Sequence, residues 1–203
     1  VEESPVKRAP KPPFTTSTIQ QSASSRLGFS PSRTMRAAQK LYEAGHITYM
    51  RTDSFNLAST ALSTIAGFVE KSYGKEYLEV RVYKTKSKNA QEAHEAIRPT
   101  EVTKTKAGTT EDEQRLYHLI HARTVASQMK DAGLLRTKIT ANIDTEHRGR
   151  SLEADYKGPS SVSIPDFAAN GSIVVFDGWL KADPHAKGED VILPKVSAND
   201  PLA

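Results

Sequence analysis

Hydrophobic residues recur at helical spacing through the first two thirds of the chain and at every second residue in part of the last third. Between about residues 31 and 44, four side chains share one side of a helix at 100° per residue: Met35, Ala38, Leu41 and Tyr42. Ser30 before Pro31 is typical of a helix start, and Gly45 of the position past a helix end. The pattern predicts a helix with one packed face.

Capping signals and periodicity predict two further helices, one before and one after this one. Ser17 and Gln20 form a possible capping box for a short helix that Gly28 can end. A helix from about 57 to 73 would end at Gly74. Its inward side chains would be Leu62, Ile65, Phe68 and Val69.

A fourth helix is predicted to begin at a second capping box, Thr110 with Glu113, and to continue toward Met129. Residues 14–132 are therefore expected to be mainly helical. Residues 4–13 carry four prolines and three basic residues, and this composition favours an extended linker that enters the helical domain.

Beyond Gly133 the period changes to two, with Thr137, Ile139, Ala141 and Ile143 alternating with their neighbours. Further candidate strands are 151–156, 173–176 and 191–193. Residues 133–203 are therefore predicted to be rich in β-strands, and the fold class is α+β.

Basic residues are concentrated at the N-terminal end. Residues 1–51 hold eight Lys and Arg against three Asp and Glu, whereas 52–203 hold twenty against twenty-one. On the predicted helix over 31–44, Arg33, Arg36 and Lys40 lie opposite the packed side. This charge suits a polyanionic partner, although a solvated helix face has the same appearance.

Cysteine is absent from the chain, which excludes disulfides, thiolate nucleophiles and cysteine-based zinc sites within it. No run of about 18 apolar residues occurs, so no membrane partner is expected. The N-terminus has neither an initiator methionine nor a leader, and we expect a cytoplasmic chain cut from a longer protein. His118 and His121 have the spacing of a metal pair, but neither carboxylate nor cysteine ligands stand near them in sequence.

The segment Ile47-Thr-Tyr-Met-Arg-Thr-Asp53 carries the clearest chemistry. A free phenol has a pKa near ~10 and is a poor nucleophile at neutral pH unless a positive charge stabilises the phenolate. In an extended backbone Tyr49 and Arg51 point to the same side, where the guanidinium could hold a nonbridging phosphate oxygen. Taken alone, a Tyr-x-Arg pair is also consistent with ordinary surface packing.

The surrounding sequence resembles the active-site region of bacterial type IA DNA topoisomerases. Three stretches carry the resemblance in the same order: 13–29, 41–54 and Asn89-Ala-Gln-Glu-Ala-His-Glu-Ala-Ile-Arg-Pro99. It implies that Tyr49 attacks one DNA strand, forms a 5′-phosphotyrosine link and releases a 3′-hydroxyl. Strand passage and religation would then relax negative supercoils without ATP.

The resemblance also implies roles for individual residues. Arg51 would stabilise the scissile phosphate, and His94 would lie near the bound strand. Further residues would organise the tyrosine or contact DNA: Gln39, Glu43, Thr48, Thr52 and Asp53. The basic residues Arg33, Arg36 and Lys40 are candidates for phosphate contact. Arg98 either contacts DNA, closes a helix or pairs with Glu95, while Glu43 and Asp53 have capping or ion pairing as alternatives.

The family's Mg²⁺ site uses an acidic D-x-D cluster in a TOPRIM domain, and no D-x-D occurs in these residues. The resemblance therefore implies Mg²⁺ ligands outside this chain and no metal site within it. It implies a toroidal, multidomain protein with a helical active-site domain over 14–132, inserted into a small antiparallel β-rich hinge domain formed by 133–203 and the edge of 1–13. The partners would be single-stranded DNA, negatively supercoiled duplex DNA, and the TOPRIM and remaining toroid domains, in a protein associated with the nucleoid.

Two other readings remain open. A tyrosine recombinase or type IB topoisomerase uses dispersed Arg, Lys and His residues around a C-terminal tyrosine, an arrangement that this sequence does not resemble. A non-catalytic module for single-stranded DNA would stack Tyr49 on bases and hold phosphates with the basic helix. Whether the isolated chain is competent in relaxation depends on the missing acidic cluster, and we expect that it is not.

Overall fold

The computed structural model describes residues 1–203 except 84–94, 142–166, 198–199 and 201–203. The contacts divide the chain into two compact units. The helical unit comprises Lys7–Ala132 and Phe176–Gly188. The sheet unit comprises Val1–Val6, Gly133–Val175 and Glu189–Ala203.

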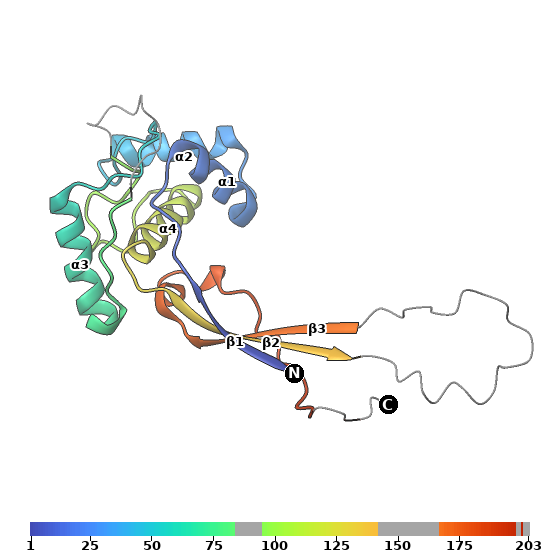
Figure 1. Cartoon of the computed structure of the whole chain (residues 1–203). Coiled ribbons are helices and arrows are strands. Elements are labelled where there is room, and N and C mark those ends of the chain that lie inside the picture. Colours follow the sequence, from blue (N-terminus) through green and yellow to red (C-terminus); the bar gives the residue numbers. More distant parts are fainter. Residues whose placement is uncertain (84–94, 142–166, 198–199, 201–203) are drawn as a thin grey trace, which may run out of the picture. The chain divides into compact units, whose positions relative to one another are not determined.

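The helical unit contains α1 (Thr16–Leu27), α2 (Pro31–Glu43), α3 (Ser59–Tyr73) and α4 (Glu111–Ala126), which Figure 1 labels. α4 is in contact with each of the other three. From Leu116 to Ala126 it is buried at every position except His118. Its side chains pack in one hydrophobic core with α1, α2 and two residues from the segment after α2, Ile47 and Met50. The core therefore anchors the chain on both sides of Tyr49.

α2 matches the predicted helix over 31–44. The Ser30 hydroxyl accepts a hydrogen bond from the Arg33 amide at 3.2 Å, and Gly45 has the positive φ of 74° that favours glycine past a helix end. Leu41 and Ala38 are buried as predicted. Tyr42 was placed on the packed side and this is wrong, since its side chain is 41% exposed.

The starts of α1 and α4 differ in detail from the predicted capping boxes. The box of α1 is formed by Thr15 and Thr18, two residues before the expected Ser17 and Gln20. Gly28 ends α1 in the left-handed conformation as predicted. Thr110 caps α4, but the carboxylate of Glu113 accepts from the backbone and hydroxyl of Thr109 instead of closing the box.

α3 begins two residues later than predicted and ends before Gly74, as expected. Ile65 and Val69 are buried, while Leu62 and Phe68 are half-buried. A short 3-10 turn, η1 (Lys75–Tyr77), follows α3.

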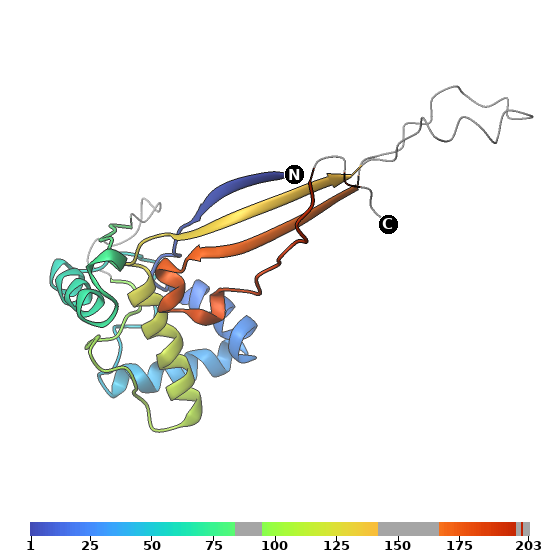
Figure 2. The ribbon, with the colours of Figure 1, turned by 90° about the horizontal axis from the view of Figure 1, so that it is seen from below.

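The sheet unit is built on three antiparallel strands in the order β1 (Glu2–Arg8), β2 (Ala132–Ala141) and β3 (Phe167–Phe176), drawn as arrows in Figure 2. The first half of the extended stretch 4–13 pairs as β1, which is the edge of the sheet, as expected for residues 1–13. Pro5 is tolerated there because β1 is an edge strand, where one row of backbone groups has no partner strand. Alternation along β2 is confirmed, since Thr137, Ile139 and Ala141 are more buried than Lys138 and Thr140.

The remaining strand predictions have different outcomes. Residues 173–176 lie in β3, whereas 151–156 lie outside the described residues. Val191 makes a single β-bridge with Ser172, so 191–193 is not a strand. Residues 176–188, expected in the β-rich domain, belong to the helical unit by contact, and form the 3-10 turns η3 (Gly178–Lys181) and η4 (Pro184–Ala186).

Burial explains why this segment joins the helices. Trp179 and Leu180 are 3% and 2% exposed, which leaves little of their large apolar surface in water. The Trp179 indole donates a hydrogen bond to the Arg8 carbonyl at 2.8 Å, and its backbone amide donates to Lys130 at 2.9 Å. η3 is therefore fixed to two distant parts of the helical unit.

Candidate active-site segment

Residues 46–54, called here the tyrosine segment, alternate in exposure from residue 49 onward. Tyr49, Arg51 and Asp53 are exposed, whereas the residues between and after them are buried: Met50, Thr52 and Ser54. The backbone bends at Met50, and Tyr49 and Arg51 on either side of it are both exposed.

One edge of the tyrosine segment is held by the start of α1. The Thr16 hydroxyl donates to the Met50 carbonyl at 2.8 Å and accepts from the Thr52 amide at 2.9 Å. The Thr16 amide donates to the Thr52 carbonyl at 2.9 Å. These bonds connect positions on both sides of Arg51 to the first turn of a helix. The sequence analysis did not single out Thr16, although it lies in the first stretch that carries the resemblance.

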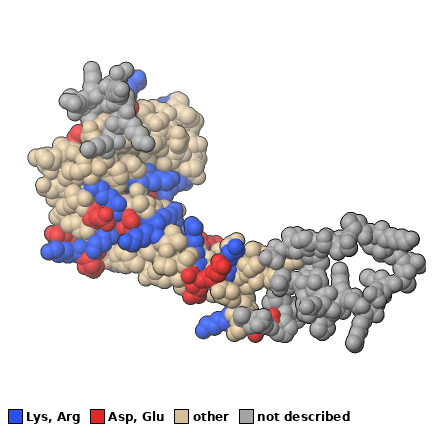
Figure 3. Space-filling view, viewed as in Figure 1, with Lys and Arg blue, Asp and Glu red and all other residues tan. Residues whose placement is uncertain are grey.

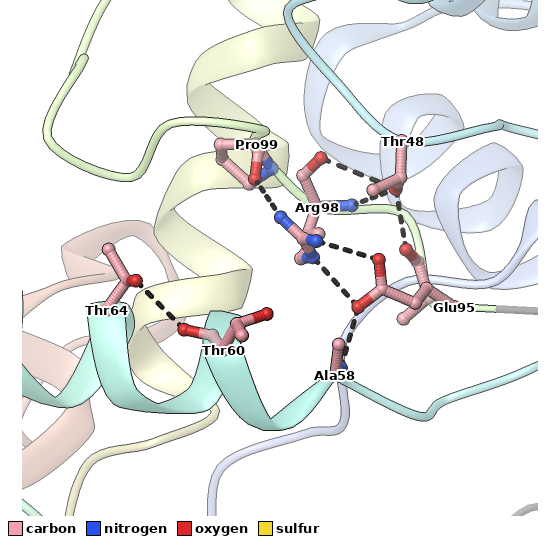
Figure 4. Close-up of polar contacts among 8 residues, drawn as sticks. Thr48, Ala58, Thr60, Thr64, Glu95, Arg98 and Pro99 are labelled. Carbon is pink, nitrogen blue, oxygen red and sulfur yellow. Dashed lines mark hydrogen bonds and ion pairs between the residues drawn. The ribbon is translucent and has the colours of Figure 1, made fainter.

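The other edge is held by residues 96–100. The Thr48 amide donates to the Arg98 carbonyl at 2.9 Å, and the Arg98 amide donates to the Thr48 hydroxyl at 3.0 Å. The same hydroxyl donates to the Ala96 carbonyl at 2.7 Å, as Figure 4 shows. Ile47 and Pro99 form an antiparallel bridge beside this pair. Thr48 therefore fixes the backbone next to Tyr49 from within the fold.

Arg98 makes an ion pair with Glu95, which is one of the alternatives that the sequence left open. Its Nη2 and Nε lie 2.7 and 3.3 Å from the two carboxylate oxygens of Glu95, and its Nη1 donates to the Pro99 carbonyl. The same carboxylate accepts from the Ala58 amide at 2.7 Å, at the N-terminus of α3 (Figure 4). A carboxylate at this position is also favoured by the helix dipole. Arg98 and Glu95 thus connect the tyrosine segment to α3.

The phenol of Tyr49 lies at the surface beside a second phenol. Its side chain is 46% exposed, and its ring meets that of Tyr42 edge to face, with centroids 5.3 Å apart and planes at 67°. This geometry is favourable for aromatic pairs. Tyr42 therefore limits the directions that the Tyr49 ring can take, and this contact was missed because Tyr42 was assigned to the core.

Arg51 and Asp53 have no hydrogen bond or ion pair among the described residues, and both side chains are exposed. No described residue occupies the donors of the Arg51 guanidinium, which can therefore bind an anion. An exposed phenol and an unpaired guanidinium two residues apart on a backbone held at both edges can engage a phosphodiester from solution.

Most polar side chains of α2 that were candidates for DNA contact are hydrogen-bonded or ion-paired within the protein. Both carboxylate oxygens of Asp112 accept from Arg33 at 2.7 Å, and this lowers the pKa of Asp112. Glu43 accepts from Gln39 at 2.9 Å and from Lys40 at 3.4 Å, and the Gln39 bond is the main reason why its pKa is lowered. Arg36 is exposed and has no ion pair in the described parts of the chain. Arg36 is thus the cation of this face that is most available to a phosphate.

The histidines do not form a metal site in the described residues. His94 lies outside those residues, so its predicted place near the DNA strand stays a prediction. His121 is buried, and one ring nitrogen donates to the Val102 carbonyl at 2.8 Å, while His118 is exposed. Across the described ranges, no group of three or more His, Asp or Glu side chains is arranged to hold a metal ion. These residues do not fit a Mg²⁺ site.

Comparison with known proteins identifies the family of this chain. A family model for DNA topoisomerase matches residues 1–203. DNA topoisomerase 1 of Streptomyces coelicolor is 45% identical over 100% of this chain and 21% of its own length. The Rickettsia felis and Vibrio cholerae enzymes of the same name are 40% and 43% identical over 100% and 99% of this chain, and 26% and 21% of their own lengths.

A solved structure, full-length topoisomerase I from Thermotoga maritima, matches with a TM-score of 0.72 and 32% identity. The match covers 97% of this chain and 30% of that one. The chain spans about a fifth to a quarter of the length of the curated relatives above. Among the described helices, none is long and apolar enough to cross a membrane. By its full-length family match, this chain belongs to the bacterial type IA DNA topoisomerases.

Proposed function

We propose that this chain supplies the attacking tyrosine of a type IA topoisomerase that cleaves one DNA strand, passes a strand and religates to relax negative supercoils. The observation that supports it most directly is the alternation in the tyrosine segment, which exposes Tyr49 and Arg51 together on a backbone held by Thr16 and Thr48. Positioning of this kind lowers the entropic part of a reaction barrier.

The chemical step is a transesterification. The Tyr49 Oη attacks the phosphorus, and the bond from phosphorus to the 3′-oxygen breaks. The phenol loses its proton, the departing 3′-oxygen gains one, and the DNA 5′-end stays attached to Tyr49 as a phosphodiester. Arg51 binds a nonbridging oxygen and offsets the charge that develops there. Because one ester replaces another, the reverse reaction restores the DNA without ATP.

Mg²⁺ would support this chemistry from outside the chain. No metal-binding cluster occurs among the described residues, and the D-x-D pattern is absent from the sequence. We therefore propose that the ligands lie in a TOPRIM domain of the full-length protein. The isolated 203-residue chain would then fail to relax supercoiled DNA, and efficient Mg²⁺-dependent relaxation by the purified chain would refute this.

The candidate DNA contacts that the structure describes divide into three groups. Arg36, Arg51 and Asp53 are exposed and without ion pairs in the described residues, so we propose Arg36 and Arg51 as the direct phosphate contacts. Thr48 and Thr52 are held by hydrogen bonds inside the fold, and we propose that they position Tyr49. Arg33, Gln39, Lys40, Glu43 and Arg98 would have to give up the internal partners described above before they bound DNA.

Covalent trapping tests the nucleophile in the full-length protein. A 5′-labelled strand loses its label from the covalent complex, so the oligonucleotide carries the label at its 3′-end. After denaturation, we expect a labelled adduct with the wild type and none with Tyr49→Phe. Tyr42→Phe keeps the ring contact with Tyr49 but removes the second phenol hydroxyl, and serves as the matched control that still forms the adduct.

The opposite result would assign the nucleophile elsewhere. If Tyr49→Phe kept the adduct and Tyr42→Phe lost it, the neighbouring phenol would be the nucleophile. If the wild type and both variants formed no adduct but bound single-stranded DNA equally, a non-catalytic binding module would be the better description.

A further inference from the structure

A cleft of about 650 Å³ lies in the helical unit and includes no residue of the tyrosine segment. Its walls come from the C-terminal end of α1, one face of α4, the loop before α4 and the turn of η4. α4 touches both α1 and η3, and η3 touches η4, so these elements come together around the cleft. Its volume falls within the ~300–1,000 Å³ typical of ligand sites.

The floor of the cleft is apolar. Leu119 and Ala122 of α4 are 4% and 6% exposed, and Leu27 of α1 packs against the core beside them. Pro184 adds a further apolar wall from η4. A flat, weakly hydrated group would gain free energy by covering such a floor.

The rim of the cleft is basic. Lys106 is exposed on the loop before α4, and the side chain of Arg115 is 41% exposed one turn before Leu119. His118 and His185 add two exposed imidazole rings, neither of which has a hydrogen bond or ion pair among the described residues. The rim therefore combines positive charge with flat rings that can stack on bases.

The acidic residue of the lining is already neutralised. Asp183 is 2% exposed, and both its carboxylate oxygens accept from Arg26 Nη1, at 2.9 and 3.0 Å. Lys106 and Arg115 are the remaining cations of the lining, and Arg115 also makes an exposed ion pair at 3.8 Å with Glu111, outside the lining. An anion that enters the cleft meets no free carboxylate of the lining.

We propose that this cleft is a second binding site for single-stranded nucleic acid, which holds one or two nucleotides apart from the tyrosine segment. Bases lie on the floor of Leu27 and Leu119 and against the histidine rings, and phosphates bind Lys106 and Arg115. Duplex DNA does not fit, because its bases are stacked inside the helix and cannot reach the floor. The proposal concerns a separate site and does not depend on Tyr49 being a nucleophile.

Titration of the 203-residue chain with the labelled dinucleotide pTpT, followed by NMR and fluorescence anisotropy, tests the proposal. We expect resonance shifts in the rings of His118 and His185. Lys106→Glu should weaken binding about tenfold and reduce the slope of log K against log salt by about 0.7, the value for one phosphate contact on a single strand. Lys104→Glu makes the same charge change two residues away, outside the cleft lining, and should stay within about twofold of wild type.

The covalent trapping described above reports on Tyr49 and the pTpT titration reports on this cleft, so failure of the proposed nucleophile and failure of this site give different results. Equal losses in Lys106→Glu and Lys104→Glu would mean general electrostatic attraction and would overturn the proposal. It would also be overturned if the histidine rings did not shift, or if a duplex or an acidic peptide competed as well as a single strand. A second variant, Pro184→Ser, alters an exposed apolar wall of the cleft outside the core and should weaken pTpT without changing the salt slope.

Discussion

Replacing Thr16 with valine would remove the hydroxyl that holds the tyrosine segment while keeping nearly the same side-chain shape. Two backbone groups would lose the partners that the structure gives them: the Met50 carbonyl, now 2.8 Å from the hydroxyl, and the Thr52 amide, now 2.9 Å from it. The Thr52 carbonyl would keep its bond from the Thr16 amide. The change is therefore confined to one donor and one acceptor.

The size of the effect follows from burial. Met50 and Thr52 are 1% and 8% exposed, so water cannot readily replace the hydroxyl. An unsatisfied buried polar group costs about 1–3 kcal/mol, which gives roughly 2–6 kcal/mol for the two. With a urea m-value of about 2 kcal/mol per M, the unfolding midpoint should fall by about 1–3 M.

Urea unfolding of the 203-residue chain, followed by circular dichroism, measures this shift. Thr64→Val is the matched control, because its hydroxyl bonds only to the Thr60 carbonyl one turn back in α3 and its side chain is exposed. It should change stability by no more than ~0.5 kcal/mol. Equal midpoints for Thr16→Val and wild type would refute the conclusion that Thr16 holds the tyrosine segment. Hydrogen exchange at the Thr52 amide gives a local check, since it should accelerate in Thr16→Val alone.

Three further predictions concern other parts of the helical unit. Glu95→Gln weakens the ion pair with Arg98 and the hydrogen bond to the Ala58 amide at the start of α3. It should lower the free energy of unfolding by about 1 kcal/mol, and this loss would shrink at high salt if Glu95 acted only through an exposed ion pair. Burial lowers the pKa of His121 below 6.5, so the unfolded chain binds the proton more readily than the folded chain. The free energy of unfolding should therefore be constant above that pH with respect to this group and fall below it, and the fall should be smaller in His121→Gln. Gly178→Ala should cost more than about 2 kcal/mol in a urea titration, because φ is 48° there and the added Cβ would collide with the Asp131 carbonyl.

Local signals in the sequence predicted the helices well and their first turns less well. Ser30 caps α2 because its side chain reaches an amide only three residues away, which sequence can reveal. Thr15 caps α1 in place of Ser17, and the first helical residue, Thr16, is bonded to Thr52, 36 residues away. Such long-range contacts override a local capping preference, and the sequence around the helix start does not indicate them.

The basic residues illustrate the same limit for the candidate site. Arg33 pairs with Asp112, 79 residues away, and also lies 4.3 Å above the Phe29 ring, so its charge serves the contact of α2 with α4. Helical periodicity correctly placed Arg33, Arg36 and Lys40 on the polar side. It could not show which of them have partners, because partners come from other elements. Of the three, Arg36 is left with no ion pair in the described residues.

The alternation in the tyrosine segment was hidden for a related reason. A half-buried strand is recognised when apolar residues point inward, but here two of the three inward residues are Thr52 and Ser54. These hydroxyl side chains are stable inside because they hydrogen-bond to nearby backbone, as when the Ser54 amide donates to the Thr52 hydroxyl at 3.0 Å. A polar interior of this kind holds the backbone by directed bonds, whereas apolar packing alone would allow it to slide. The segment that presents Tyr49 and Arg51 therefore gains a fixed register from residues that, in sequence, look like surface.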